Sequence, residues 1–139
     1  MNYWLMKSEP SSWSWDDQQA RGDGGEGWDG VRNHQASNNM KAMEIGDLAF
    51  FYHSVNEKRI VGIVEVTRLY HPDPTDASGR FGMVTVKAVK SMKRPVTLAE
   101  IKAEERLADM ALVRQSRLSV TPVSADQWAL IMALGETTL

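Results

Sequence analysis

Short runs of apolar and aromatic residues, separated by polar turns, predict several β-strands in this chain. Residues 2–7 form the first run, and the polar, proline-containing break that follows predicts a short buried strand with Lys7 and Ser8 at its rim. Further β-branched or aromatic runs lie at residues 47–53, 59–70 and 83–90. Residues 60–64 are almost continuously apolar, which is typical of a strand buried on both faces. We therefore expect the strand over 59–70 to be the most interior.

Capping residues and helical spacing predict two helices in the first half of the chain. Ser14 precedes Asp17 by three positions, an N-cap pattern that predicts a short helix over 15–21. Apolar residues recur at helical spacing over 33–43, where we expect a second helix. Residues 22–27 include four glycines and two acids, which would repel a phosphate. We expect a mobile loop there and not a phosphate cradle.

The last third of the chain predicts two more helices and an edge strand. Capping boxes at residues 97–100 and 124–127 predict the helix starts, and Gly135 is the expected end of the second helix. Residues 117–123 predict an edge strand, because Pro122 has no N–H to donate to a neighbouring strand. The mixture of elements predicts an α+β fold in which several strands curl into a small barrel or a strongly bent sheet, with helices around it.

Composition supports one folded domain over residues 1–139. The chain is 42% hydrophobic and 24% charged, and no segment repeats another or resembles an interdomain linker. The absence of cysteine excludes a disulfide scaffold and a thiolate metal site, and it suits a reducing compartment, so we expect a cytoplasmic protein. The N-terminus has no basic leader or cleavage site, and no apolar run reaches about 18 residues. We therefore expect neither export nor a membrane partner.

Charge is unevenly distributed, although the formal net charge is only −2. Residues 9–29 carry six acids and one base, whereas residues 80–94 carry five bases and no acid. The sequence leaves two interpretations of the basic strip open. Its lysines lie on the solvent-exposed face of a half-buried strand, or they form a surface that contacts a phosphate backbone.

Residue patterns give little support for catalysis. The three histidines, His34, His53 and His71, lack the spacing of metal ligands, so we expect no metal site. No glycine-flanked serine elbow, phosphate-binding loop or dinucleotide-binding fingerprint is present, and we expect no cofactor.

Tryptophans and amides suggest a binding site. Four of the five tryptophans are expected in the core: Trp4, Trp13, Trp15 and Trp128. Trp28 follows the glycine-rich segment and is expected at the wall of a cleft. Four polar side chains can hydrogen-bond to the edge of a nucleic-acid base: Arg32, Asn33, Gln35 and Asn38. Helix capping and hydrogen bonds that hold a loop in place would explain the same residues.

Several motifs together resemble the EVE domain family over nearly the whole chain. They are Tyr3-Trp4-Leu5-Met6-Lys7-Ser8-Glu9-Pro10, Trp28-Asp29-Gly30-Val31-Arg32-Asn33-x-Gln35-Ala36, Phe50-Phe51-Tyr52-His53-Ser54, Tyr70-x-Pro72-Asp73-Pro74-Thr75 and Arg117-Leu118-Ser119-Val120-x-Pro122-Val123. The resemblance implies a PUA-like mixed β-barrel surrounded by short helices and related to YTH domains. It also implies a non-catalytic reader of modified bases, especially 5-methylcytosine and 5-hydroxymethylcytosine, with DNA favoured over RNA as the partner.

The resemblance assigns roles to particular residues. The base pocket would be lined by Lys7, Ser8, Trp28, Arg32, Asn33, Asn38, Tyr52, His53, Ser54 and Phe81. Apart from the resemblance, we expect four basic residues to contact the nucleic-acid backbone: Arg80, Lys90, Arg94 and Arg117. The sequence departs from the family pattern at Ser37, where an arginine is common, and at Phe81, which follows a short loop and replaces a tryptophan.

Two other functions remain open from the sequence. The same barrel could bind structured RNA through shape and phosphates. Alternatively, the chain could be a small enzyme that acts on a nucleotide, with His53 as the base. The sequence does not define the oligomeric state.

Overall fold

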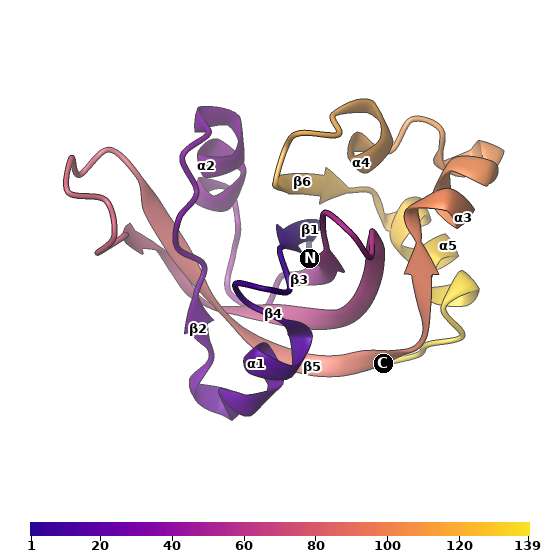
Figure 1. Ribbon diagram of the computed structural model, residues 1–139, viewed down its shortest axis with the longest axis horizontal. Helices are drawn as coiled ribbons and strands as arrows, with labels where there is room; N and C mark the ends of the chain where they lie inside the picture. Colours follow the sequence, from indigo (N-terminus) through magenta and orange to yellow (C-terminus); the bar gives the residue numbers. More distant parts are fainter.

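The computed structural model describes residues 1–139 and contains one six-stranded mixed sheet in the order β2-β5-β4-β3-β1-β6 (Figure 1). The strands are β1 (Tyr3–Ser8), β2 (Glu26–Gly27), β3 (Leu48–His53), β4 (Arg59–Pro72), β5 (Gly82–Thr97) and β6 (Val120–Val123). β1 pairs with β3 in parallel, and the other neighbouring strands are antiparallel. β4 is central in this order, as its apolar run predicts.

Five α-helices and two 3₁₀ turns surround the sheet. They are α1 (Trp15–Ala20), the 3₁₀ turn Gly22–Gly24, α2 (His34–Lys41), α3 (Leu98–Ala103), the 3₁₀ turn Glu105–Leu107, α4 (Ala111–Arg114) and α5 (Ala125–Leu134). The capping boxes predicted at Thr97 and Ser124 are formed, and the N-cap predicted at Ser14 is also a capping box, so three helix starts follow directly from local sequence. None of these helices has the length and apolar character needed to cross a membrane.

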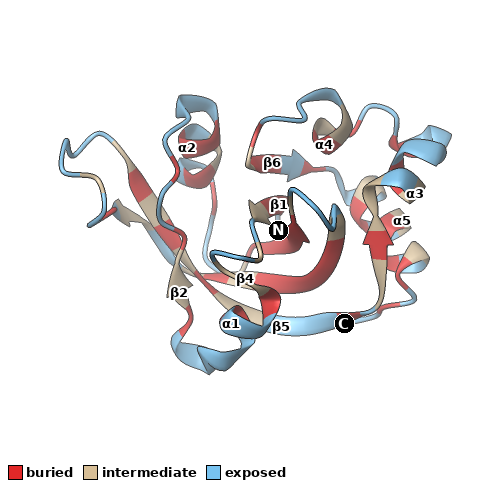
Figure 2. Cartoon of the chain, viewed as in Figure 1, coloured by how far each residue is buried: buried red, intermediate tan, exposed pale blue.

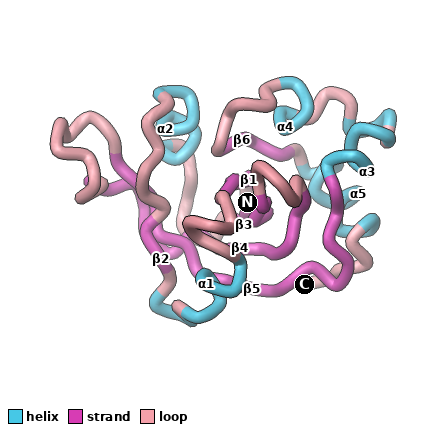
Figure 3. Tube along the Cα trace, viewed as in Figure 1, coloured by secondary structure: helices cyan, strands magenta, loops and turns pink.

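The predicted barrel is not closed. β4 and β5 curve together around β1 and β3 (Figure 3), but β2 and β6 remain as the two edges of the sheet. β2 has only two residues, and Pro122 in β6 has no N–H to donate. The supported description is an α+β fold with a strongly bent open sheet.

β5 is longer than the predicted strand over 83–90. It extends over Gly82–Thr97 because it stays paired with β4 from Pro72↔Gly82 to Arg59↔Thr97. Several register shifts between the two strands allow this long pair to bend. The basic residues Lys93 and Arg94, which lie beyond the predicted strand, therefore also belong to β5.

The glycine-rich segment 22–27 is also more ordered than predicted. It forms a 3₁₀ turn and then β2, whose Glu26 and Gly27 pair with Val86 and Thr85 of β5. A Cβ on Gly25 would lie 2.5 Å from the Val86 carbonyl oxygen, and φ of Gly25 is +67°. Glycine there lets the chain approach β5 closely, which the interpretation as a mobile loop missed.

Both faces of the sheet are covered by hydrophobic clusters. Trp4 and Met6 of β1 belong to the cluster beneath α1 and α2, whereas Leu5 belongs to the one beneath α3 to α5. The same alternation separates Phe51 from Phe50 in β3. Figure 2 shows that burial is concentrated on the central strands. This two-sided core fixes which side chains remain at the strand ends.

Candidate functional site

A cavity of about 370 Å³ lies between the C-terminal end of β1 and the edge strand β2. Its lining residues come from the end of β1, the turn after it, and β2 with the following loop: Lys7, Ser8, Glu9, Ser12, Trp13, Glu26, Gly27, Trp28 and Asp29. We call it the Lys7–Trp28 cavity. It brings together Lys7, Ser8 and Trp28, three residues that the sequence analysis places in one pocket.

Lys7 supplies the only cation of this cavity. Its ammonium donates a 2.7 Å hydrogen bond to the Ser116 carbonyl oxygen and lies 5.9 Å from the centre of the Tyr52 ring. Burial lowers the pKa of Lys7 from its ordinary value. An ammonium has three N–H donors, so two remain for a ligand.

Ser8 positions the turn that carries Trp13. The Ser8 hydroxyl donates a 2.5 Å hydrogen bond to the Trp13 carbonyl oxygen, and the Ser8 carbonyl accepts one from the Ser54 N–H. The Trp13 indole N–H donates to the Gln18 side chain at 3.0 Å, and Gln18 is buried and donates in turn to Val86. Trp13 is therefore a half-buried ring held in place at the cavity.

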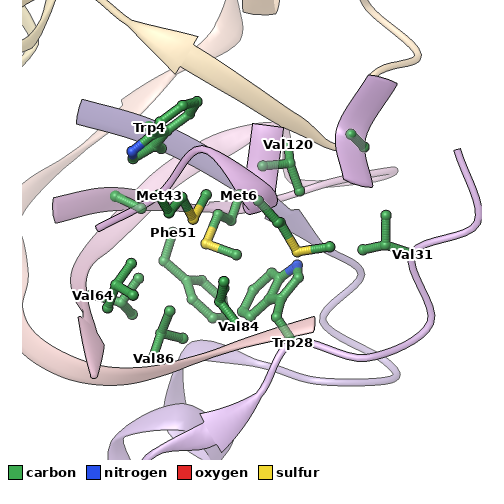
Figure 4. Packing of buried hydrophobic residues seen from close by; sticks show 14 of the residues in the cluster. Trp4, Met6, Trp28, Val31, Met43, Phe51, Val64, Val84, Val86 and Val120 are labelled. Carbon is green, nitrogen blue, oxygen red and sulfur yellow. The ribbon is translucent and has the colours of Figure 1, made fainter. Parts of the chain in front are cut away.

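Trp28 is more deeply buried than predicted. Only 7% of the residue is exposed, and its ring meets Phe51 edge to face, with centroids 5.5 Å apart (Figure 4). The Trp28 N–H continues the β2–β5 ladder by donating to Val84. Trp28 lines the cavity, but its ring is packed in the hydrophobic core and is not an exposed surface for stacking. Trp13, which we expected in the core, is the more accessible ring.

Carboxylates outnumber cations around the cavity. Glu9, Glu26 and Asp29 line it together with the single ammonium of Lys7. A phosphate would be repelled by such a rim, whereas the N–H groups of a neutral ring would find acceptors. The acids of residues 9–29 are evident in the sequence, but their position at this cavity is not.

Arg32 is a structural residue and does not line the cavity. Its guanidinium donates to the Asp73 carboxylate at 3.1 Å and to the Thr75 hydroxyl at 2.9 Å. Burial by itself would raise the pKa of Asp73, but hydrogen bonds from Thr75, Gly30 and Arg32 outweigh it and lower the pKa to about 2. Arg32 and Asp73 therefore tie the segment after Trp28 to the end of β4.

Asn33, Asn38 and Phe81 also lie outside the cavity. The Asn33 side chain caps α2 by accepting a 2.9 Å hydrogen bond from the Ala36 N–H. Asn38 is exposed on α2, and Phe81 packs against His34 at 4.9 Å between ring centroids. The Asn33 side-chain oxygen therefore fills the capping role that the sequence left open.

Asn33 additionally lines a second hollow, which we call the Arg117 groove. It has a volume of about 300 Å³ and is lined by Asn33, Gln35, Gln115, Ser116, Arg117 and Leu118.

The residues at the end of β3 are held inside the fold. Tyr52 is buried, and burial raises its pKa to about 12. His53 is 8% exposed; its Nε2 accepts from the Trp15 N–H at 3.0 Å, which leaves the proton on Nδ1 to bond Glu57 at 3.0 Å. Both ring nitrogens are therefore engaged within the fold, and His53 does not line the cavity, so the structure offers no support for His53 as a ligand contact or base. Ser54 touches the site only through its backbone bond to Ser8.

The four predicted backbone cations differ in their contacts. Lys90 donates to the Thr138 carbonyl, and Arg94 is paired with Glu100 and Glu136, so both fasten neighbouring segments to β5. Arg80 is exposed in the loop before β5. Arg117 is exposed in the Arg117 groove, next to the Lys7–Trp28 cavity.

Five residues line the cavity without having been predicted from the sequence: Glu9, Ser12, Trp13, Glu26 and Asp29. For Trp13 a signal was available, because it lies in a polar serine-rich turn, immediately before the N-cap Ser14. A tryptophan in such a turn has fewer apolar neighbours than one in a strand.

Comparison with known proteins relates almost the full length of this chain to one protein family. Residues 2–134 match the EVE domain. Mouse thymocyte nuclear protein 1 is 36% identical over 168 residues, covering 98% of this chain and 74% of the mouse protein. The NMR structure of Rpa0253 from Rhodopseudomonas palustris is 60% identical with a TM-score of 0.92, covering 98% of this chain and 94% of that one.

A crystal structure of human THYN1 in complex with 5-methylcytosine-containing DNA is also similar. It has a TM-score of 0.92 at 33% identity and covers 100% of both chains. These matches confirm the resemblance inferred from the motifs: the chain belongs to the EVE domain family.

Proposed function

We propose that this chain is a non-catalytic nucleic-acid-binding domain that accepts one modified base, of the 5-methylcytosine or 5-hydroxymethylcytosine type, in the Lys7–Trp28 cavity. The observation that carries the proposal is the convergence of Lys7, Trp13 and Trp28 on one cavity of about 370 Å³. The complex of human THYN1 with 5-methylcytosine-containing DNA supports it and favours DNA over RNA.

The chemistry of the cavity matches a cytosine ring. The exocyclic amino group of cytosine is a donor that glutamate or aspartate accepts, and Glu9, Glu26 and Asp29 offer such acceptors. The acceptor atoms on the same edge of the ring suit the free N–H donors of Lys7. Trp13 and Trp28 provide the apolar surface for the ring itself. This arrangement also explains how a cavity with an acidic rim can serve a polyanionic partner, since the base and not the phosphate enters it.

The net affinity for the base must come mainly from polar contacts in the cavity, because the other contributions nearly cancel. Stacking on an aromatic ring contributes about 1–3 kcal/mol per base, and removing a base from a duplex costs a few kcal/mol. These two contributions nearly cancel. Burying one methyl group adds about 0.8 kcal/mol, roughly a fourfold preference. We therefore expect modest selectivity for the methylated base unless the cavity also excludes competitors by shape.

The test is a titration with matched oligonucleotides that carry cytosine, 5-methylcytosine or 5-hydroxymethylcytosine at one position, in DNA and in RNA. We expect tighter binding of a modified DNA and no change in the mass of the oligonucleotide after incubation. Trp13→Ala should reduce the preference and Trp13→Phe should keep most of it, because the phenyl ring retains an aromatic face. Absent binding, or equal affinity for all bases, contradicts the proposal. Preference for structured RNA without regard to modification would favour the alternative function.

A further inference from the structure

The Arg117 groove lies directly beside the Lys7–Trp28 cavity. Lys7 lines the cavity and Ser116 lines the groove, and the two residues are joined by the 2.7 Å hydrogen bond from the ammonium to the Ser116 carbonyl oxygen. The two hollows therefore share one wall. The groove is therefore the neighbouring surface that the backbone of a strand with one base in the cavity would meet.

Hydrogen bonds within the groove leave mainly donors free. The Asn33 side-chain oxygen is occupied by the Ala36 N–H, and the Gln115 side-chain oxygen accepts from Gln35 at 2.8 Å. The NH₂ groups of Asn33 and Gln115 have no partner and remain free to donate, whereas the Gln35 side-chain oxygen is a free acceptor in the same groove. With the guanidinium of Arg117, the groove presents N–H groups from three side chains. Such a set fits the oxygen atoms of an anion.

Charge distinguishes the two hollows. Arg117 is exposed, is the only charged residue that lines the groove, and forms no ion pair. The cavity next to it is lined by Glu9, Glu26 and Asp29. A phosphodiester is therefore repelled from the mouth of the cavity and attracted to the groove, whereas a neutral base is not repelled from the cavity.

We infer that the Arg117 groove binds the phosphodiester that flanks the base held in the Lys7–Trp28 cavity, an inference that rests on the proposed function. Phosphate contacts position a strand but carry no base information. The groove then contributes affinity and sets the path of the strand, and the cavity contributes selectivity.

The experiment uses single-stranded pentanucleotides of deoxyadenosine and deoxycytidine, with cytosine or 5-methylcytosine at the centre. Arg117→Ala should weaken binding of both oligonucleotides by the same factor, about three- to tenfold at low salt. The slope of log affinity against log salt should fall by about 0.7, the value for one contact to a single-strand phosphate. Arg117→Lys should retain most of the affinity. Arg106→Ala is the matched control, because Arg106 is an exposed arginine paired with Glu104 and lines neither hollow.

A second measurement compares 5-methyl-2′-deoxycytidine with its 5′-phosphate and its 3′-phosphate. One phosphate should improve binding to the wild type, and this gain should disappear in Arg117→Ala, which also identifies the direction of the strand. Unchanged affinity and salt slope in Arg117→Ala overturn the inference, as does a phosphate gain that survives the substitution. Failure of the proposed function appears separately, as a wild-type protein that does not distinguish the methylated from the unmethylated pentanucleotide.

Discussion

The indole of Trp15 occupies the space directly over Gly62. A Cβ on Gly62 would lie 2.3 Å from the nearest atom of the Trp15 ring. Trp15 is the first residue of α1, where its N–H donates to His53 and its indole N–H donates to Ser91. The same short helix carries Gln18, which holds the Trp13 ring at the cavity. Gly62 in the central strand β4 thus supports the site through α1.

Gly62→Ala should destabilise the fold and weaken ligand binding together. The added methyl group forces the Trp15 ring to move, and overpacking of this kind costs about 1–3 kcal/mol. Urea unfolding measures the free-energy change. Gly24→Ala is the matched control, because a Cβ there meets no atom within 4 Å and φ is not positive. Equal stability of the two variants would contradict the described packing of Trp15 on Gly62.

Much of the secondary structure could be predicted from local sequence. Three capping boxes define helix starts because the bonded groups are only three residues apart. The apolar run of β4 identifies the central strand because burial on both faces removes any need for polar positions. Local sequence could not determine whether the sheet closes into a barrel, because closure depends on pairing between the two edge strands, which are distant in the sequence. In the structure the edge strands β2 and β6 do not pair.

The site was only partly predictable for the same reason. Lys7 and Ser8 end a recognisable strand, so their position at a rim follows from the sequence. The burial of Trp28 depends on its long-range contact with Phe51, which no local pattern reveals, whereas the exposure of Trp13 has a local signal in its polar, serine-rich turn. His53 has the residue type of a base, but its role is decided by Trp15, far away in the sequence.

His53→Ala should lower stability without removing any ligand contact. The substitution removes the hydrogen-bond acceptor of the Trp15 N–H and leaves a void where the imidazole ring was buried. We expect the unpaired N–H to cost about 1–3 kcal/mol. His53→Gln should be milder, because an amide oxygen can accept from the Trp15 N–H in place of Nε2. Chemical denaturation compares the two variants. Oligonucleotide affinity under conditions where both are folded should match the wild type, and a selective loss of binding in His53→Gln would restore His53 as a ligand residue.

Asp73→Asn should show a pH-dependent destabilisation. The folded-state pKa of Asp73 is about 2, below the ordinary 3.8, so its ionised form contributes stability above pH 3.8 that is lost as the pH falls toward 2. The size of this contribution is on the order of 2 kcal/mol. We therefore expect the difference in unfolding free energy between wild type and Asp73→Asn to shrink between pH 4.5 and pH 2.5. Urea titrations at these two pH values measure it, and a constant difference would contradict the role assigned to the bonds from Thr75, Gly30 and Arg32.

Lys7→Met should weaken oligonucleotide binding about tenfold, because a hydrogen bond from a charged donor contributes about 1.5–3 kcal/mol. Burial lowers the pKa of Lys7, so the ammonium of the wild type is lost at a lower pH than that of an ordinary lysine. Affinity should therefore begin to fall as the pH is raised through the alkaline range, whereas Lys7→Arg, which stays charged, should give a flat profile. Oligonucleotides of deoxyadenosine and deoxycytidine avoid the titration of guanine and thymine in the same range. If Lys7→Met binds as tightly as the wild type, or if the wild type and Lys7→Arg share one profile, Lys7 does not contact the base, and the carboxylates and indoles of the cavity must account for recognition without it.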